Sequence, residues 1–226
     1  MRFDRIIKQI GITKFEELQT KTVLVFGLGG VGSYAAEALV RSGIQNIIIL
    51  DKDLIEESNI NRQLIALTST IGKPKVEVMK ARLLDINPKC NIITYQLFYN
   101  FETKDEVFNN DIDYVIDAID TITFKIDIIK ECLARKIIFI SSMGQAGKLH
   151  PELLEIADVR KTTYDPIAKV IRNKVSKEQI VGRIPVIYSK EQALKGSKEE
   201  GLASNALVPP SAGILAASYI INKIIE

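Results

Sequence analysis

Runs rich in apolar residues alternate with amphipathic stretches through the first part of the chain. The apolar runs are rich in Val and Ile and lie at positions 23–26, 47–50, 91–96, 114–118 and 137–141. The first two runs are continuous, which is typical of strands in a parallel sheet that is covered on both faces. The stretches between them have the spacing of helices. The pattern therefore predicts an α/β fold with a Rossmann-like, doubly wound, mainly parallel sheet.

Both ends of the chain, and one internal segment, depart from this alternation. Residues 2–19 predict two short helices separated by Gly11, and residues 53–67 are polar and then helical. After Gly147 the pattern predicts an antiparallel extension at 148–159, a basic helix at 165–177 and a last strand at 184–189. We expect a single domain over 1–226, made of N-terminal helices at 1–20, a core at 21–145 and an extension with a C-terminal helix at 146–226.

The last segment, LVPPSAGILAASYIINKIIE, is apolar and follows a predicted mobile loop at 196–204. A membrane span needs about 20 apolar residues in succession. Here Pro209 and Pro210 open the segment, and Asn222 and Lys223 interrupt it. We expect a buried helix and no stable membrane insertion.

The first apolar run ends in the glycine-rich turn GLGGVG and passes directly into an amphipathic helix. Glycine lets the backbone approach a ligand without a Cβ clash, and the free N–H groups of a helix N-terminus attract anions. The second run ends at Asp51, where a carboxylate can accept hydrogen bonds from ribose hydroxyls. The core is therefore predicted to bind a nucleotide through this aspartate and four glycines, Gly27, Gly29, Gly30 and Gly32.

Nearby cations and a second carboxylate distinguish between nucleotides. The motif N-x-N-R-Q supplies Asn59, Arg62 and Gln63, and G-K-P-K-V-E supplies Lys75. A triphosphate carries more negative charge than the pyrophosphate of a dinucleotide, so it needs fixed counter-charges. Asp120 ends the fourth predicted strand, and a carboxylate at this edge suits Mg²⁺ held together with ATP. These residues favour ATP and Mg²⁺ over NAD.

Composition and charge add two limits. Thirty Lys and Arg against 28 Asp and Glu give a formal charge of +2, which does not by itself indicate a nucleic-acid-binding protein. Residues 160–198, however, contain ten basic and three acidic side chains. Cys90 and Cys132 are the only cysteines, which excludes a disulfide framework and paired C-x-x-C zinc sites and suits a reducing, cytoplasmic location.

Five motifs together resemble the ubiquitin-activating-enzyme-like adenylating superfamily: GLGGVGS, LDKD, SNINRQ, GKPKVE and DAIDT. The match spans most of the chain. Further segments are similar to the branch that dehydrates threonylcarbamoyladenosine in tRNA, namely RFDR, LTSTIGKPKVEVM, YVIDAIDT, ISSMG and KTTYDPIAKVIR. Members of this branch use ATP to adenylate the threonyl carboxylate and then close it into a cyclic, ester-like ring. The resemblance implies this tRNA modification as the activity.

The resemblance also implies a role for each candidate residue. Gly30 would abut the phosphates, Asp51 would hold the ribose, and Asp120 would bind Mg²⁺ with Thr121 beside it. The triphosphate would be bound by Ser58, Asn59, Arg62 and Lys75. Arg5 would be donated across a homodimer interface to stabilise the leaving pyrophosphate. Catalysis would then depend on Arg5, Arg62, Lys75 and Asp120. The candidates for tRNA phosphate contacts are Arg160, Lys161, Lys169, Arg172, Lys174, Lys177 and Arg183.

Two further features are implied by the resemblance. One is a monovalent cation, Na⁺ or K⁺, near Ser141, Ser142 and Met143 at the mouth of the site, although Gln145-Ala146-Gly147 stands where relatives tend to read A-G-N. The other is association with a cysteine desulfurase system.

Three other functions stay open. The main alternative among enzymes is adenylation of the C-terminal glycine of a ubiquitin-like sulfur-carrier protein, against which the missing zinc cysteines argue. A non-catalytic nucleotide sensor would bind ATP without turnover. A nicotinamide oxidoreductase would bind NADH without competition from ATP.

Overall fold

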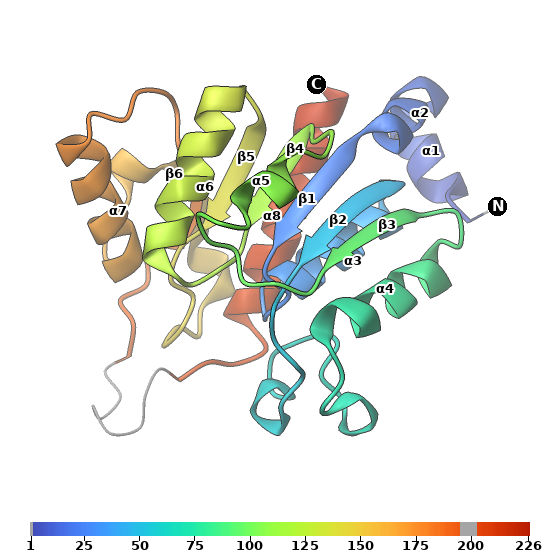
Figure 1. The fold of residues 1–226 in the computed structure, drawn as a ribbon, viewed down its shortest axis with the longest axis horizontal. Coiled ribbons are helices and arrows are strands. Elements are labelled where there is room, and N and C mark those ends of the chain that lie inside the picture. Colours follow the sequence, from blue (N-terminus) through green and yellow to red (C-terminus); the bar gives the residue numbers. More distant parts are fainter. Residues whose placement is uncertain (1, 195–202) are drawn as a thin grey trace.

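The computed structural model describes residues 2–194 and 203–226, so most of the loop predicted at 196–204 lies outside the described residues. In the described part, seven strands form one sheet in the order β3-β2-β1-β4-β5-β7-β6 (Figure 1). Only β6 and β7 pair antiparallel. The predicted parallel sheet with an antiparallel extension is confirmed. The strands are β1 (Thr22–Phe26), β2 (Asn46–Leu50), β3 (Asn91–Tyr95), β4 (Tyr114–Asp117), β5 (Ile138–Ser142), β6 (Leu154–Asp158) and β7 (Pro185–Ser189).

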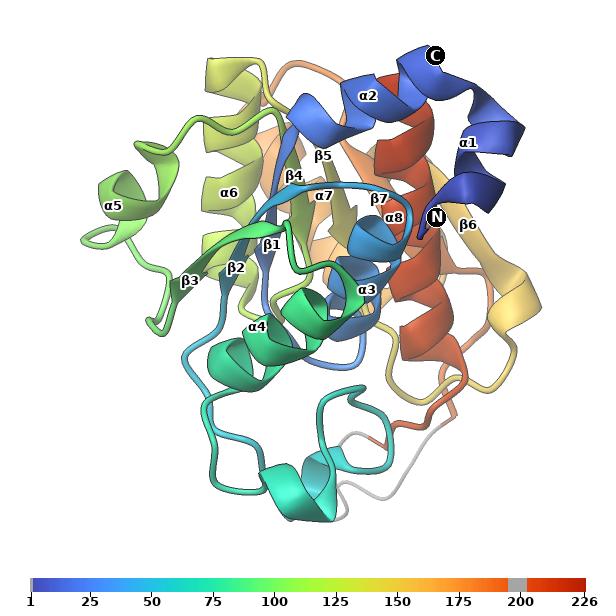
Figure 2. The same ribbon diagram turned by 90° about the vertical axis from the view of Figure 1, so that its right-hand side faces the viewer.

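Helices cover both faces of the sheet. Figure 2 shows α5 and α6 on one side and α3, α4 and α8 on the other. The helices are α1 (Asp4–Ile10), α2 (Ile12–Thr20), α3 (Gly32–Arg41), α4 (Lys75–Ile86), α5 (Lys104–Phe108), α6 (Ile122–Arg135), α7 (Pro166–Lys177) and α8 (Val208–Ile225). The two N-terminal helices meet at Gly11, whose φ is +85°, as predicted.

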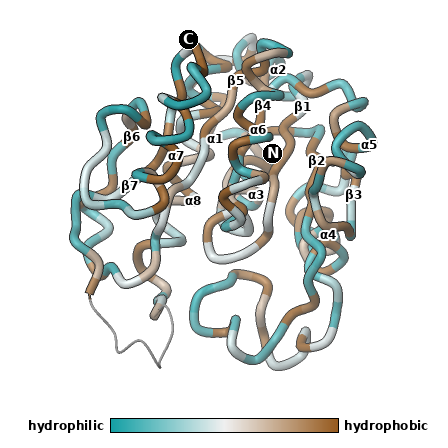
Figure 3. The backbone as a smooth tube through the Cα atoms, turned by 60° about the vertical axis from the view of Figure 1, so that its left-hand side comes forward, coloured by the Kyte–Doolittle hydropathy of each residue, from teal (hydrophilic) through white to brown (hydrophobic). Residues whose placement is uncertain are grey.

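The central strands are apolar because both of their faces are buried. In β1, Val23 and Val25 join the core beneath α3 and α8, whereas Leu24 and Phe26 join the core beneath α5, α6 and α7. Successive side chains of a strand point to opposite faces, so a continuous apolar run fills both cores. In Figure 3 the tube at β1 is accordingly mainly brown, the hydrophobic end of the scale.

The C-terminal helix α8 is long and apolar enough to span a membrane by length and composition, yet one of its faces lies in the core. Small residues let it approach α3 closely: a Cβ built on Gly213 would lie 2.2 Å from the carbonyl oxygen of Val31. Pro209 of α8 lies against the glycine-rich turn: a Cβ built on Gly30 would lie 3.1 Å from the Cβ of Pro209. The predicted burial of this helix is confirmed for that face, which supports the turn from behind.

The segment 53–67 differs from the prediction that it becomes helical. It contains the short 3₁₀ turn Glu57–Asn59, and a second such turn, Thr68–Thr70, follows it. Side chains satisfy the backbone locally, because Asn59 Oδ1 accepts a bond from Glu56 N and Thr70 Oγ1 accepts one from Leu67 N. Such bonds compete with those of an α-helix. The short helix α5 was not predicted either.

Candidate nucleotide and tRNA site

The four glycines of the turn serve different purposes. Gly27 has φ +83°, and a Cβ there would lie 3.0 Å from the carbonyl oxygen of Ala118. A Cβ on Gly32 would lie 1.8 Å from the carbonyl oxygen of Gly27, so these two glycines are required by the packing of the turn itself. A Cβ on Gly29, in contrast, would have only Gln63 Nε2 within 4 Å, at 3.9 Å. Gly29 therefore faces open space that a ligand can enter.

A cavity of ≈ 430 Å³ opens beside this turn, at the carboxyl ends of β1, β2 and β4. This edge is where ligands of open α/β sheets bind. Ten of the predicted residues line the cavity together: Gly27, Gly29, Gly30, Asp51, Asn59, Arg62, Gln63, Lys75, Asp120 and Thr121. Gly32 and Ser58 are not among its lining residues; Gly32 acts in the packing of the turn, and Ser58 gives its carbonyl oxygen to Arg62.

Asp51 is fixed at the end of β2 by two backbone bonds. Its Oδ2 accepts from Leu28 N at 2.7 Å and its Oδ1 from Asp53 N at 2.8 Å. Burial raises the pKa of this carboxyl, and the charge of Lys75 and the two N–H bonds oppose that effect only in part. A second lone pair on each oxygen is left to accept a ribose hydroxyl.

The cations of the cavity are held by neighbouring side chains. Lys75 is the first residue of α4, and its Nζ lies 3.1 Å from Asp53 Oδ2 and 3.9 Å from Asp51 Oδ2. Arg62 donates to the carbonyl oxygen of Ser58 at 2.9 Å and to Asn61 Oδ1 at 2.8 Å. Gln63 Oε1 is buried against the cavity without a hydrogen-bond partner among the described residues. An acceptor in that position is suited to a donor on a ligand.

The two carboxylates of the DAID motif have different surroundings. Asp117 is fully buried and paired with Lys125 at 2.8 Å, whereas Asp120 is exposed at the cavity and accepts from Thr121 Oγ1 at 3.4 Å. Asp120 is thus the carboxylate that is free to meet an ion. The described residues contain no group of three or more His, Cys, Asp or Glu side chains that could hold a metal. One carboxylate fits Mg²⁺ that arrives with a triphosphate, because that ion usually keeps several waters and few protein ligands.

The apolar wall of the cavity was not predicted from the sequence. Leu97, Phe98 and Tyr99 follow β3 and line the side next to Asp51. Phe98 is 41% exposed, and Lys52 Nζ lies 4.8 Å from the centre of its ring. An apolar wall of this kind suits a flat nucleobase. The signal in the sequence was the apolar QLFY directly after the third strand, since β3 pairs in parallel with β2 and ends at the same edge.

Arg5 does not line the cavity of its own chain. Its side chain is exposed on α1, and α1 packs on α2. The helix α2 leads into the start of β1, which lies at the edge of the sheet opposite the cavity. The structure therefore does not bring Arg5 together with Arg62 and Lys75 within one chain.

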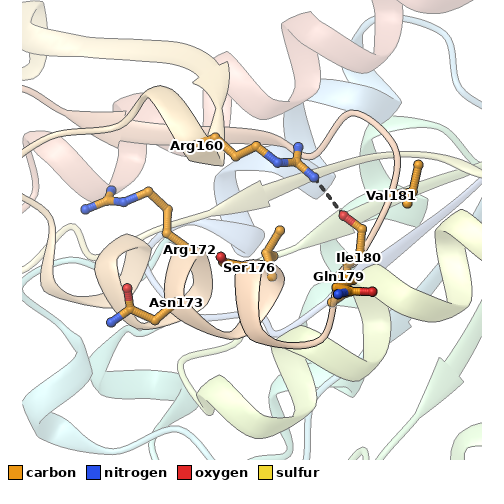
Figure 4. Close-up of a pocket in the computed structure, with 8 residues that line it drawn as sticks. Arg160, Arg172, Asn173, Ser176, Gln179, Ile180 and Val181 are labelled. Atoms are coloured by element: carbon orange, nitrogen blue, oxygen red, sulfur yellow. Dashed lines mark hydrogen bonds between the residues drawn. The ribbon is translucent and has the colours of Figure 1, made fainter.

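The seven basic candidates for tRNA binding are spread along α7 and beyond it. Arg160 follows β6 and Arg183 precedes β7, and both lie at the edge opposite the cavity, because β7 runs parallel to β5 and antiparallel to β6. Arg160 donates to Ile180 O at 2.8 Å (Figure 4). It also donates to Asp158 and to Gly182 O at 3.0 Å. Arg172 donates to the backbone and hydroxyl of Thr162.

These two arginines line an open cavity of ≈ 590 Å³ at that far edge (Figure 4). Their guanidinium groups already hold the local structure, so they are less free to contact phosphate than the lysines are. Lys161, Lys169 and Lys177 are exposed, and Lys174 is half-buried. Asp165 caps the N-terminus of α7 and accepts a bond from Lys148, which lies in the loop after β5.

The end of β5 and the loop after it were expected to form the mouth of the site, and they do not. Ser141, Ser142 and Met143 are buried and do not line the cavity. Gln145 Nε2 lies 3.3 Å from each of three oxygens, Ser142 Oγ, Met143 O and Ile187 O. In this orientation the amide donates to these oxygens, while its own Oε1 is buried without a hydrogen-bond partner among the described residues. A monovalent cation near this loop stays a prediction.

A sequence model of the ThiF family matches residues 3–196. The chain belongs to the ThiF family. Within it, the chain is 45% identical to the tRNA threonylcarbamoyladenosine dehydratase of Bacillus subtilis (strain 168), and the alignment covers 100% of this chain and 95% of that relative. The enzyme of the same name from Haemophilus influenzae is 34% identical, over 92% of this chain and 87% of its own length. The expected branch of the family is thereby confirmed.

Solved structures of this ThiF branch agree with the fold. The Escherichia coli tRNA N6-threonylcarbamoyladenosine dehydratase in complex with ATP superposes with a TM-score of 0.93 at 31% identity, covering 99% of this chain and 93% of that one. A further structure, named TcdA (CsdL), gives a TM-score of 0.94 at 30% identity, covering 99% and 94%. E. coli MccB with ATP is 21% identical, with a TM-score of 0.71 over 100% of this chain and 63% of that one, and shares the fold alone.

Proposed function

We propose that this protein is an ATP-dependent dehydratase that cyclises threonylcarbamoyladenosine in tRNA through an acyl-adenylate of the threonyl carboxylate. One observation carries the proposal: in a chain 45% identical to such a dehydratase over its full length, glycines, carboxylates and cations converge on one cavity. The E. coli relative whose structure contains ATP has the same fold. We therefore assign ATP to this cavity.

Each lining residue has a role in this proposal. Gly29 and Gly30 admit the phosphates, and Asp51 accepts the ribose hydroxyls. Asn59, Arg62, Gln63 and Lys75 bind the triphosphate and the groups next to it, while Asp120 and Thr121 would hold Mg²⁺ bound with ATP. The metal would neutralise phosphate charge when bound.

The reaction needs positioning more than a protein nucleophile. A carboxylate oxygen of the substrate attacks the α-phosphorus, and the bond to the β-phosphate breaks as pyrophosphate leaves. The carbamoyl oxygen then attacks the acyl carbon, AMP leaves with the former carboxylate oxygen, and a proton is released from the carbamoyl group. Arg62 and Lys75 would stabilise the charge that builds on the phosphates during the first step.

The two cysteines fit a mechanism without a thioester. Cys90 and Cys132 are buried free thiols, and burial raises the pKa of both. A thiolate is the reactive form of cysteine, so neither side chain is suited to attack an adenylate. Direct attack by the carbamoyl oxygen is the simpler route.

Assembly and partners belong to the proposal too. Arg5, exposed on α1, would enter the phosphate site of a second copy in a homodimer, and the lysines of α7 would contact tRNA phosphates. Association with a cysteine desulfurase system and a cytoplasmic location stay predictions.

The proposal is tested by incubating the protein with ATP and tRNA that carries threonylcarbamoyladenosine, followed by mass spectrometry of the nucleosides. The product should be lighter by one water, and omission of ATP should abolish it. If the nucleoside is unchanged while a sulfur-carrier protein stimulates exchange of pyrophosphate into ATP, the protein adenylates that carrier instead. If ATP binds with no exchange and no product, it is not an enzyme of this class.

A further inference from the structure

A fully buried ionic cluster lies behind the nucleotide cavity. Lys125 Nζ is 2.8 Å from Asp117 Oδ2, Ser141 Oγ donates to the same oxygen at 2.5 Å, and Lys125 Nζ lies 3.3 Å from Ser141 Oγ. All three residues have no exposed surface. None of them lines the cavity, so none contacts a bound nucleotide directly.

The cluster joins the elements that meet beneath the β4–α6 turn. Asp117 is the last residue of β4, Lys125 lies in the second turn of α6, and Ser141 belongs to β5. Asp117 Oδ1 also accepts from Ile119 N, at 3.3 Å, inside the turn itself. One carboxylate thus ties a strand, a helix, a neighbouring strand and the backbone that directly precedes Asp120.

Asp120 depends on this backbone for its position. Its side chain is exposed, and the hydrogen bond that the described residues give it comes from its neighbour Thr121 at 3.4 Å. A carboxylate that binds an ion must be held in place by residues behind it, because an exposed side chain alone samples several rotamers.

Stability alone does not account for the cluster. Removing two charges from water costs free energy that their attraction barely recovers, and apolar replacements of a buried pair are often as stable. The cluster instead orients the Asp117 carboxylate. Three hydrogen bonds converge on it and fix both its plane and the turn that follows it.

We propose that Lys125 is a positioning residue that, through Asp117, holds the 118–121 turn so that Asp120 meets the ion bound with ATP. The inference rests on the proposed role of Asp120 in the function above. It assigns a role in the reaction to Lys125, Asp117 and Ser141, which do not reach the substrate.

The test compares two charge-free pairs. Asp117→Asn/Lys125→Met removes the cluster without leaving a lone buried charge. The matched control is Asp165→Asn/Lys148→Met, because Lys148 and Asp165 form an equally buried pair at 3.2 Å, with side chains 1% and 0% exposed. Thermal unfolding establishes that both variants are folded. The readout is the Mg²⁺ concentration that gives half of the maximal ATP affinity, measured by calorimetry without tRNA.

We expect the Asp117/Lys125 variant to need about 10-fold more Mg²⁺, the usual cost of losing a residue that orients a metal ligand, and the control to stay within about twofold. In an Asp120→Asn background the Asp117/Lys125 change should have no further effect. The inference would be overturned if both double variants raised the required Mg²⁺ concentration equally. It would also be overturned if the Asp117/Lys125 change still raised that concentration in the Asp120→Asn background. Absence of tRNA dehydration by the wild type would instead reject the proposed function and leave this measurement valid.

Discussion

The cavity edge of the sheet and the basic stretch around α7 use charge in opposite ways. At the cavity edge, Lys75 and Arg62 are buried or half-buried and turned toward a space that is large enough for a nucleotide. In the basic stretch around α7, charged residues either hydrogen-bond to the protein backbone, as Arg160 does before α7, or are exposed to solvent, as Lys169 is on α7. The first region is built for one small anion at fixed positions, and the second suits the extended, repetitive charge of a nucleic acid. Charge count alone does not separate them.

The largest effect is expected from removing a cavity cation. Arg62→Ala should lower the turnover of ATP with tRNA about 1,000-fold, because the charge on the departing phosphates loses a fixed counter-charge. Rates of AMP release give the measurement. Arg41→Ala is the matched control, since Arg41 is an exposed arginine on α3 that pairs with Glu37. A loss of less than about tenfold would contradict the contrast between the two regions.

Arg5 tests whether the cavity is completed by a second copy. Arg5→Ala should lower turnover about 100-fold while ATP affinity changes little, because the arginine acts on the leaving pyrophosphate. Mixing Arg5→Ala with Arg62→Ala subunits should restore activity, since one site of a mixed dimer then has both arginines. If the mixture remains as inactive as its components, Arg5 does not act across an interface.

The lysines of α7 should matter for tRNA and not for ATP. The triple variant Lys169→Gln/Lys174→Gln/Lys177→Gln should bind tRNA with a weaker dependence on salt. The slope of the logarithm of the tRNA association constant against the logarithm of the salt concentration should become shallower by about 0.9 for each phosphate that a lysine no longer neutralises. Fluorescence anisotropy over a salt series measures this slope, and calorimetry should give unchanged ATP affinity. Lys89→Gln, exposed beside β3 at the other end of the sheet, serves as the control. An unchanged slope would move the tRNA surface away from α7.

The smallest effect is expected from removing the Asp158 carboxylate, which holds Arg160 at the edge of the sheet opposite the cavity. Burial raises the pKa of Asp158, but the N–H groups of Ile184 and Arg160 and the Arg160 guanidinium outweigh it and hold the pKa below its ordinary value of 3.8. A depressed carboxyl pKa adds stability above the unfolded pKa, and that stability is lost as the pH falls through the folded pKa. Asp158→Asn should therefore cost about 1 kcal/mol at neutral pH, and the cost should shrink below pH 3.8. Denaturant unfolding at several pH values measures it, and a pH-independent cost would contradict it.

Much of the cavity edge was predictable because its positions are set by topology. Gly27, Asp51 and Asp120 follow the ends of β1, β2 and β4, which meet at one edge of a parallel sheet, so these residues converge there. The 53–67 segment was less predictable, because local bonds from Asn59 decide its path. Ser141 was expected at the mouth of the site, but it is buried in β5, between β4 and β7, and donates to Asp117. No pattern in the sequence reveals this bond.

The basic stretch was the least predictable part. The count of ten basic residues is a property of the sequence, whereas their placement depends on how β6 and β7 pair. That pairing sends Arg160 and Arg183 to the edge away from the cavity. Bonds such as those of Arg160 to backbone carbonyls form only in the folded chain.

The most direct test of the proposed chemistry follows one oxygen atom. tRNA whose threonyl carboxylate carries heavy oxygen is converted with ATP, and the released nucleotides are analysed by mass spectrometry. An acyl-adenylate requires that the label appear in AMP, because the carboxylate oxygen stays on the α-phosphorus when the ring closes. Heavy oxygen in inorganic phosphate, with ADP as the released nucleotide, would contradict adenylation at this cavity.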